Sequence, residues 1–281
     1  MVIDIHTHCF PERIAERAFG QLSRAAGIPV HTAGTAGALA RSAKEAGIGV
    51  SVVQPVATDP MKVDHLNAFA AEINLRTTGT GVMSFAALHP LMPDLPAGVK
   101  RIREMGFKGV KLHPVYQETP TDGLPFLRAL ECCYAEGLAV LVHAGWDIGV
   151  PGRDDACVRR LGRMLRALPP RGLILAHMGG WGEWDTEEYL GMPELWLDTA
   201  FCLHTGAETF LRAEDCLRMI RAHGADRVLF GTDSPWSDQR EELARLRALG
   251  LSPEEEEAVE GGNACRLLGL TPPARAGRPA D

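Results

Sequence analysis

The stretch VIDIHTHCFP, residues 2–11, combines a short apolar run with two histidines separated by a single residue. The run is rich in β-branched side chains and ends at a proline, so it predicts a buried β-strand. Side chains alternate between the two faces of a strand, and His6 and His8 are therefore expected on the same face. Two imidazoles contribute little to the packing of a buried strand, which points to a functional role for its end.

Similar apolar runs recur along the chain and alternate with stretches of helical periodicity. Strands that are apolar throughout and alternate with helices indicate a parallel sheet covered on both faces. Eight such units predict an α/β fold, a single-domain (β/α)8 TIM barrel, with a doubly wound open sheet as the alternative. The other seven runs are 49–55, 81–90, 107–114, 138–145, 172–180, 195–200 and 227–235, and the clearest helical stretches are 64–77, 124–137, 155–168 and 213–224.

We expect the barrel to occupy residues 1–270. Residues 252–270 predict a helix with an acidic start and then a closing helix, since acidic side chains favour a helix N-terminus. Residues 271–281 are rich in proline and polar side chains, so they predict a flexible C-terminal tail.

The composition is that of a soluble globular protein, with 281 residues, 46% hydrophobic and 23% charged side chains, and a net charge of −7. This charge argues against a nucleic-acid partner. No apolar segment reaches the roughly 18 residues of a membrane span. The seven scattered cysteines are expected to be free thiols in a reducing compartment, and we expect a cytoplasmic protein without a signal peptide.

Polar side chains gather at the ends of the predicted strands. In a parallel barrel these ends share one face, which carries the chemistry. Six of the ten histidines lie there, whereas His31, His65, His204 and His223 fall in predicted loops or helices and are expected at the surface. The strand-end residues are His6, His8, His89, Lys111, His113, His143, His177 and Asp233.

Four of these residues, His6, His8, His143 and Asp233, form a ligand set of imidazoles and a carboxylate. Three or four such ligands with one open position are typical of a catalytic zinc site, and manganese, iron or nickel are alternatives. We predict one divalent metal per chain, which would lower the pKa of a bound water towards about 7.

Six motifs together resemble the amidohydrolase superfamily, in its amidohydrolase-related (amidohydrolase 2) branch. They run from the first strand nearly to the end of the chain. The motifs are DIHTH (4–8), GVKLHP (109–114), LVHAG (141–145), LAHMGG (175–180), LFGTDSPW (229–236) and GNACRLLGL (262–270).

The resemblance implies a distorted TIM barrel that in most members of this branch holds one metal. His6, His8 and His143 match the family's metal ligands, and Asp233 matches a carboxylate that serves as ligand or base. His177 matches a histidine that contacts substrate or moves protons. Relatives in this family often form homodimers.

Lys111 has two interpretations in this family. In binuclear relatives the corresponding lysine is carboxylated and bridges two metals, with the fifth- and sixth-strand histidines on the second metal. In the mononuclear branch it is unmodified, and we predict an unmodified amine near the metal. The alternative that does not depend on the family is a cation that pairs with Asp233 or binds a substrate carboxylate.

Other residues near the strand ends are given supporting roles. Asp198 is expected to hold a ligand histidine, and Cys9 to contribute packing. Trp146, Trp181 and Trp236 each follow a strand-end motif, where they either line an apolar pocket above the metal or pack within loops.

The favoured function is a hydrolase in which a metal-activated water, deprotonated by Asp233, attacks a small-molecule amide, ester or lactone. His113 or His177 would then stabilise the oxyanion or protonate the leaving group. The alternative is a nonoxidative decarboxylase, a lyase of a small carboxylic acid, although such relatives tend to lack the Lys–x–His pair of GVKLHP. A TatD-like nuclease fits less well, because it has a glutamate at this strand. Substrate choice is expected to depend on loops 9–47, 55–63, 114–123 and 181–193.

Overall fold

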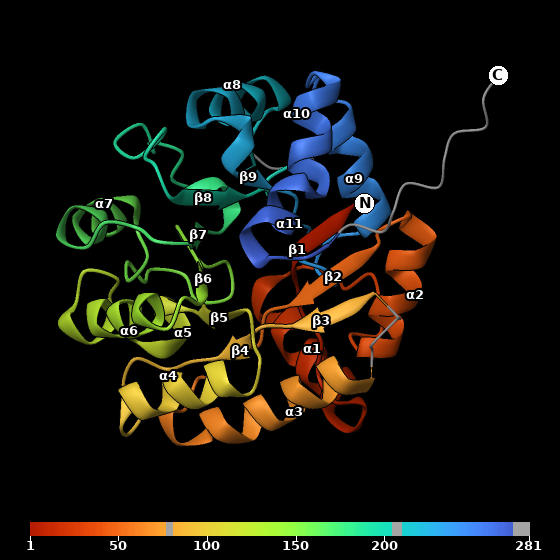
Figure 1. The fold of residues 1–281 in the computed structure, drawn as a ribbon. Helices are drawn as coiled ribbons and strands as arrows, with labels where there is room; N and C mark the ends of the chain where they lie inside the picture. Colours follow the sequence, from red (N-terminus) through yellow and green to blue (C-terminus); the bar gives the residue numbers. More distant parts are fainter. Residues whose placement is uncertain (77–80, 204–209, 272–281) are drawn as a thin grey trace.

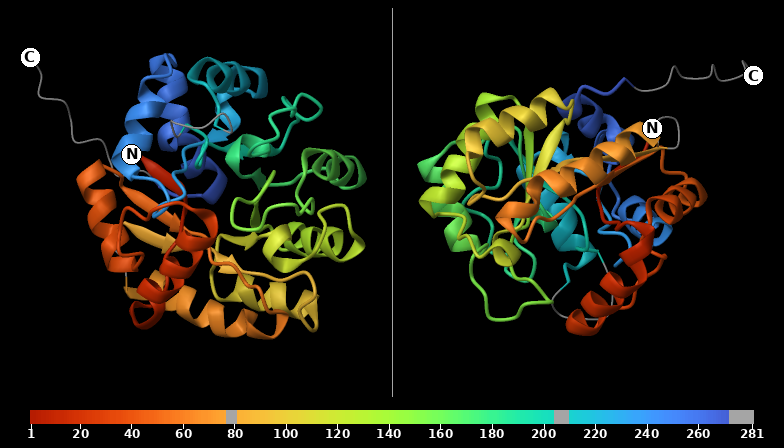
Figure 2. Two further views of the ribbon diagram at one scale, coloured as in Figure 1. Left: turned by 180° about the vertical axis from the view of Figure 1, so that it is seen from behind. Right: turned by 90° about the horizontal axis from the view of Figure 1, so that it is seen from below.

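The computed structural model describes residues 1–76, 81–203 and 210–271. Within them parallel strands form a central sheet that helices surround (Figures 1 and 2). The strands are β1 (Ile3–Thr7), β2 (Val50–Val53), β3 (Val82–Ser84), β4 (Ala86–Ala87), β5 (Gly109–Leu112), β6 (Ala139–Val142), β7 (Leu173–Leu175), β8 (Leu195–Asp198) and β9 (Val228–Leu229).

Two hydrogen-bonded sheets, β1-β2-β3 and β4 through β9, close into one barrel. On one side only Phe85 separates β3 from β4, and its N–H donates to Val53 O at 2.9 Å, so these two strands form one interrupted barrel strand. On the other side Ile5 N–H donates to Phe230 O at 2.9 Å, which joins β1 to β9. The predicted (β/α)8 barrel is therefore confirmed, and the open doubly wound sheet is wrong.

The apolar strands divide their side chains between two packed layers. Leu141, Ile174 and Leu229 belong to one buried cluster with Phe85, and their strand neighbours such as Val140 belong to a larger cluster shared with the helices. Alternate side chains of each strand thus face the barrel interior and the helical shell. Burial of both faces explains why these strands are apolar throughout.

The helices lie outside the strands, and several begin at capping side chains. The Thr35 hydroxyl accepts a hydrogen bond from Ala38 N–H at the start of α2, and Ser252 and Glu255 form a capping box at α10. The helices are α1 (Glu12–Ala26), α2 (Ala36–Ala46), α3 (Val63–Arg76), α4 (Leu95–Glu104), α5 (Pro114–Gln117), α6 (Leu124–Ala135), α7 (Val158–Ala167), α8 (Ala213–His223), α9 (Gln239–Arg247), α10 (Pro253–Glu257) and α11 (Asn263–Leu268).

The helix boundaries largely follow the sequence, with two differences. The helix expected from residue 155 begins at Val158, and the segment 252–270 contains a π-helical turn, Ala258–Gly262, between α10 and α11. Residues 272–281 of the predicted tail lie outside the described residues. All seven cysteines are free thiols, as predicted. Among the described residues no helix is long and apolar enough to cross a membrane.

An irregularity in β1 orients the first histidine. Ile3 and Ile5 pack in the barrel interior, whereas the Asp4 carboxylate accepts a hydrogen bond from Gln239 at the start of α9, outside the barrel. Strict alternation would place His6 on the same side as Asp4. The pairing of β1 with β2 changes register between Asp4 and Thr7, and this shift lets His6 face inward after Ile5.

Candidate active site

Most of the polar side chains predicted at the strand ends line a single cavity of about 430 Å³. They reach it because all the strands are parallel, so that their carboxyl ends share one end of the barrel. The predicted residues in its lining are His6, His8, Lys111, His113, His143, His177 and Asp233.

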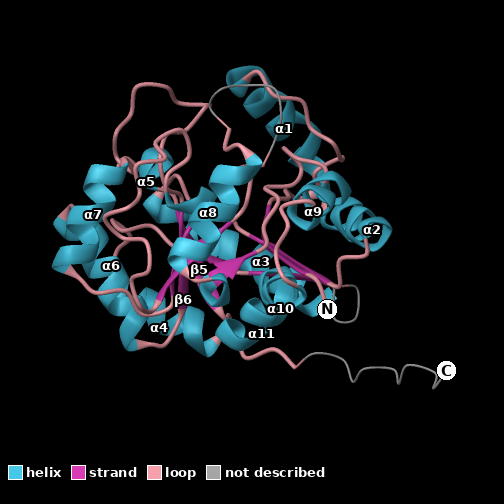
Figure 3. Ribbon diagram, turned by 90° about the horizontal axis from the view of Figure 1, so that it is seen from above, coloured by secondary structure: helices cyan, strands magenta, loops and turns pink. Residues whose placement is uncertain are grey.

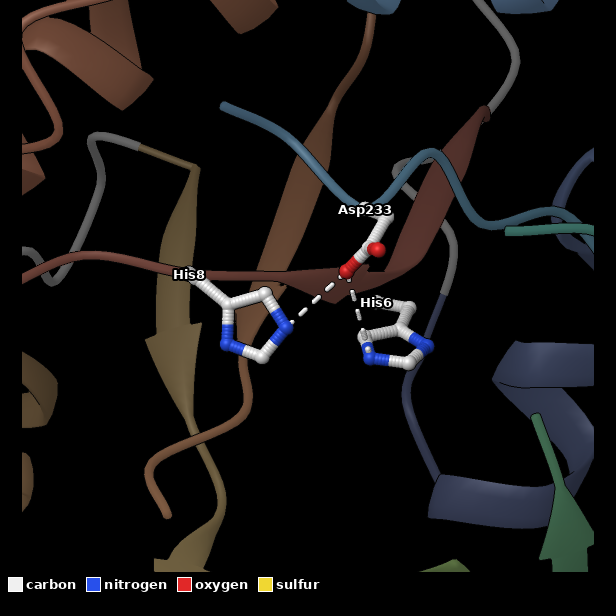
Figure 4. Close-up of side chains that lie close together, drawn as sticks. All are labelled: His6, His8 and Asp233. Carbon is white, nitrogen blue, oxygen red and sulfur yellow. Dashed lines mark ion pairs between the residues drawn. The ribbon is translucent and has the colours of Figure 1, made fainter. Parts of the chain in front are cut away.

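Three of these residues bring potential metal ligands together. His6 Nε2 lies 3.6 Å, and His8 Nε2 3.0 Å, from Asp233 Oδ1, and Figure 4 shows both rings beside that carboxylate. Two imidazole nitrogens and a carboxylate oxygen form a donor set that suits a divalent first-row metal. The three donors lie within 4.8 Å of one another, so this group fits an ion.

Backbone contacts between the two ends of the barrel chain hold Asp233 beside the histidines. Its N–H donates to His6 O at 2.8 Å, and His8 N–H donates to Ser234 O at 2.6 Å. Asp233 adopts a left-handed conformation with φ of 65°, which aspartate tolerates better than most non-glycine residues. The sharp change of direction after β9 therefore places the carboxylate against β1.

Asp198, at the end of β8, orients the His6 ring. Its Oδ2 accepts a hydrogen bond from His6 Nδ1 at 2.9 Å, and its Oδ1 accepts from the His177 and Ala200 N–H groups at 2.8 and 3.0 Å. The predicted contact between Asp198 and a candidate ligand histidine is present. Because Nδ1 carries the proton, His6 Nε2 keeps a lone pair, which lies 2.9 Å from Lys111 Nζ and 3.6 Å from Asp233 Oδ1.

Lys111 is fully buried and its Nζ lies 2.9 Å from His6 Nε2. Burial lowers the pKa of Lys111 to about 8 and, together with the Lys111 charge, holds the pKa of His6 well below its usual value. Burial alone would raise the pKa of Asp233, but the hydrogen bond with His8 and the nearby His6 keep it well below the usual range. The site therefore combines an ionised carboxylate, neutral His6 and a buried lysine that is mainly cationic at neutral pH.

His143 and His177 form a second, separate pair. Trp146 O accepts a hydrogen bond from His143 Nε2 at 3.0 Å, and Ala200 O accepts one from His177 Nδ1 at 2.8 Å. The remaining nitrogens, His143 Nδ1 and His177 Nε2, face each other at 3.1 Å. In neutral rings both carry lone pairs, so this contact requires a shared proton or a cation.

The structure does not bring all four predicted metal ligands into one tight group. Among the described residues, one group with atoms within 4.8 Å of one another joins His6, His8 and Asp233. A second joins His6, His177 and Asp198, and His143 falls in a third with His113 and Asp147. His143 therefore approaches the metal group through His177, whose ring centroid lies 5.1 Å from that of His6.

Asp147 is a site residue that the sequence analysis missed. Its Oδ2 lies 3.4 Å from His113 Nε2, and the His113 ring stacks on His143 at 4.2 Å. Burial raises the pKa of Asp147 and lowers those of His113 and His143. Asp147 follows His143 by four residues in an irregular loop. The sequence signal that could have identified it is a carboxylate so soon after a strand-end histidine.

Gly145 joins the loop that follows β6 to the loop that follows β7. Its φ is 90°, and a Cβ there would lie 2.2 Å from Trp181 N. The neighbouring backbone pairs, Trp146 N–H to Trp181 O at 2.9 Å and Trp181 N–H to Ala144 O at 3.0 Å, require this approach. Gly145 thus fixes one wall of the cavity.

We expect Gly145→Ala to lower the free energy of unfolding by about 3 kcal/mol, from backbone strain and disturbed hydrogen bonds. Denaturant unfolding measures it. Gly137→Ala is the matched control, because Gly137 has a φ of 65° but no atom within 4 Å of a Cβ; it should cost only about 1 kcal/mol. Equal losses in the two variants would show that the contact with Trp181 does not matter.

Aromatic side chains dominate the outer part of the cavity. The three predicted tryptophans, Trp146, Trp181 and Trp236, all line it, which agrees with the pocket interpretation rather than with loop packing alone. Trp181 is buried, whereas Trp146 is 47% exposed. Phe10, Phe19, Leu22, Ile28 and Phe201 also belong to the apolar lining.

Small residues near the site serve close packing. A Cβ on Gly179 would meet Tyr189, and one on Gly180 would meet Val158. Cys9 packs in an apolar cluster as predicted, and it also lines the cavity.

The remaining histidines lie away from the metal group. His223 was expected at the surface, which is wrong: it is fully buried, and its Nε2 donates to Leu195 O at 3.0 Å. His89 lies outside the cavity lining, and its Nδ1 accepts the Leu91 N–H at 3.1 Å. His31 and His65 are exposed, and His204 lies outside the described residues.

Comparisons with known proteins agree with this fold. No curated protein matches the chain. Three solved structures are similar to it over 96% of its length. They are an uncharacterized TIM-barrel protein from Bordetella bronchiseptica (19% identity, 98% of that chain, TM-score 0.75), a proposed 2-pyrone-4,6-dicarboxylic acid hydrolase from Pseudomonas putida (20%, 97%, 0.68) and a dihydroxybenzoic acid decarboxylase from Polaromonas with bound manganese (17%, 97%, 0.70).

At these identities the structures establish the TIM-barrel fold alone. The family comparison is more specific, because the amidohydrolase model matches residues 3–270, from β1 to just beyond α11. The resemblance seen in the sequence motifs is thus confirmed, and the chain belongs to the amidohydrolase family.

Proposed function

We propose that this chain is a metal-dependent hydrolase that acts on a small-molecule amide, ester or lactone. The position of Lys111 carries this proposal, because its buried amine lies 2.9 Å from His6 Nε2, within the candidate metal group. Addition of water to a carbonyl concentrates negative charge on one oxygen, and a preorganised cation there stabilises the transition state more than the neutral substrate.

A divalent metal is supported by membership of the amidohydrolase family and by the donor set on β1 and after β9. We propose that His6, His8 and Asp233 hold one ion; the predicted fourth ligand, His143, joins them only if its Nδ1 turns away from His177. Zinc suits these donors, and manganese, which the Polaromonas structure contains, is the main alternative. When bound, such an ion polarises a carbonyl and lowers the pKa of water.

The chain's own residues supply the proton transfers and the charge stabilisation. Asp233, held ionised beside His8, accepts a proton from the attacking water. Lys111, which we propose is unmodified, stabilises the developing oxyanion. The His143–His177 contact holds or shares a proton, and His177 delivers it to the leaving group, with His113 as the alternative acid.

The size and lining of the cavity favour a small apolar substrate. The cavity volume of about 430 Å³ fits a small molecule, and its tryptophan and phenylalanine side chains offer apolar contacts. Among the described residues, the one other lysine or arginine in this lining besides Lys111 is Lys62, just before α3.

Decarboxylation is the second candidate, and one observation favours it. Three tryptophans around the cavity suit a flat aromatic ring, and the similar Polaromonas structure is a dihydroxybenzoic acid decarboxylase. In that reaction Lys111 would bind the carboxylate before it leaves. A cation stabilises the carboxylate more than the carbanion that follows, which is why hydrolysis is the favoured proposal.

A substrate panel separates the two reactions. We expect metal-loaded protein to hydrolyse lactones, esters or amides of apolar acids, measured by proton release, and to release no CO2 from hydroxybenzoates. Lys111→Met should lower hydrolysis by about 10²-fold with metal retained, whereas Lys44→Met, at an exposed position of α2, should not change it. Release of CO2 without any hydrolysis would contradict the proposal and select the decarboxylase.

A further inference from the structure

A second cavity of about 420 Å³ lies at the end of the barrel opposite the active site, and its charged lining is entirely basic. Among the described residues no aspartate or glutamate lines it, although the chain has seven more acidic than basic side chains. The basic residues of the lining, here called the basic cavity, are Arg103, Lys108, Arg171 and Arg266.

The four cations come from separate elements that meet at the amino ends of the strands. Lys108 immediately precedes β5, and Arg171 precedes β7, while Arg103 lies in the last turn of α4 and Arg266 in α11. Figure 3 shows α4 and α11 at the same edge of the barrel. Five residues of extended chain separate Lys108 from His113, about 16 Å, so a ligand here does not touch the metal group.

The basic residues of this cavity lack the ion pairs that the arginines of α7 make. On α7, Arg160 and Arg163 both pair with Asp122, at 2.8 and 2.6 Å. Within the described part of the chain no carboxylate lies within 4.0 Å of Arg103, Lys108 or Arg171. Like charges held around one cavity repel each other, and an anion between them would relieve this repulsion.

Arg266 is held in place by contacts that leave its charge uncompensated. Its Nη2 donates to Asp226 O at 2.5 Å and to Asn263 Oδ1 at 3.0 Å, and its guanidinium lies 5.5 Å from the centre of the Trp196 ring. A carbonyl, an amide and an aromatic ring orient the group without neutralising it. A guanidinium fixed in this way loses less freedom when it binds an oxyanion.

We propose that the basic cavity binds a small anion of the phosphate class with two or more negative charges. Arginine side chains bind phosphate oxygens in pairs, and lysine supplies a point charge. The volume admits pyrophosphate or a small phosphorylated metabolite and is far too small for a macromolecule. Such an anion would contact basic side chains of α4 and α11 together with those that precede β5 and β7.

Isothermal titration of the full chain with pyrophosphate at low salt tests the proposal. We expect wild type to bind, with the affinity at least tenfold lower in Lys108→Glu/Arg171→Glu. The matched control is Arg41→Glu/Lys44→Glu, which makes the same change in net charge on exposed α2 and should stay within about twofold of wild type. Inorganic phosphate should bind more weakly than pyrophosphate. If the ligand is a phosphorylated metabolite, a nucleoside triphosphate should bind at least as tightly as pyrophosphate.

Three results would overturn the proposal. The first is that wild type does not bind pyrophosphate. The second is that both variants lose affinity equally, which indicates a general charge effect, and the third is that neither loses affinity, which places the anion elsewhere, such as at the metal group. Pyrophosphate should also raise the thermal midpoint of wild type and of the control but not of the reversed variant. If the Glu variant fails to fold, Lys108→Gln/Arg171→Gln replaces it, and retained affinity in that variant likewise overturns the proposal.

Discussion

His6→Ala/His8→Ala is expected to purify without its divalent metal and to lose on the order of 10³-fold or more in turnover. The two imidazoles supply two of the three donors that lie within 4.8 Å of one another, and Asp233 alone cannot retain the ion. Elemental analysis of the purified variant measures the metal, and steady-state assays measure turnover.

The fold of this variant should persist, because the backbone contacts between β1 and residues 230–234 do not involve the lost rings. Circular dichroism checks it. His31→Ala, which removes an exposed histidine, controls for adventitious metal on surface imidazoles and should keep both metal and activity. An unchanged metal content in the double variant would place the ion elsewhere and refute the proposed site.

His177→Ala should keep its fold and its metal but lose about 10²-fold or more in turnover, the usual scale for a positioned proton-transfer group. The reason is the contact of His177 Nε2 with His143 Nδ1 at 3.1 Å, which in the neutral rings leaves a site for one shared proton. Turnover and metal content are measured on the same preparation. Added imidazole should restore part of the activity, which a purely structural defect would not allow.

Two outcomes would change this assignment. If His177→Ala loses its metal, the His143–His177 pair holds a cation, and Lys111 becomes a candidate bridging ligand between two ions. If it keeps near-normal activity, the ring only packs against Ala200 and His6, and His113, held by Asp147 at 3.4 Å, becomes the better candidate for the acid.

The barrel could be predicted because its strands carry a local signal. A strand buried on both faces must be apolar along its whole length, and runs such as 138–145 show this without any knowledge of their partners. The break at Phe85 and the register shift in β1 could not be predicted, because they arise from pairing with β2 and β5 rather than from local composition.

The direction of a site residue could be predicted only where that residue lies on a regular strand. Lys111 and Asp198 lie on regular strands, so their direction follows from the barrel, whereas His6 faces inward only because of the register shift in β1. Asp147 lies in a loop, where no periodicity predicts direction. The burial of His223 was missed because it depends on a hydrogen bond from its ring to the Leu195 carbonyl, on a strand distant in sequence. The separation of His143 from the metal group likewise depends on side-chain hydrogen bonds.

The join between β1 and the segment after β9 has a consequence for how the protein is made. His8 and Asp233 lie 3.0 Å apart in space but belong to opposite ends of the chain, and their neighbours Asp4 and Thr232 are hydrogen-bonded across the same join. During synthesis the first strand emerges long before its partner exists, so the nascent chain exposes two histidines that have no carboxylate to complete their site. Loading of the proposed metal is therefore expected only after β9 and Asp233 have been translated, and a product truncated before β9 would be an open barrel that lacks one of the three donors.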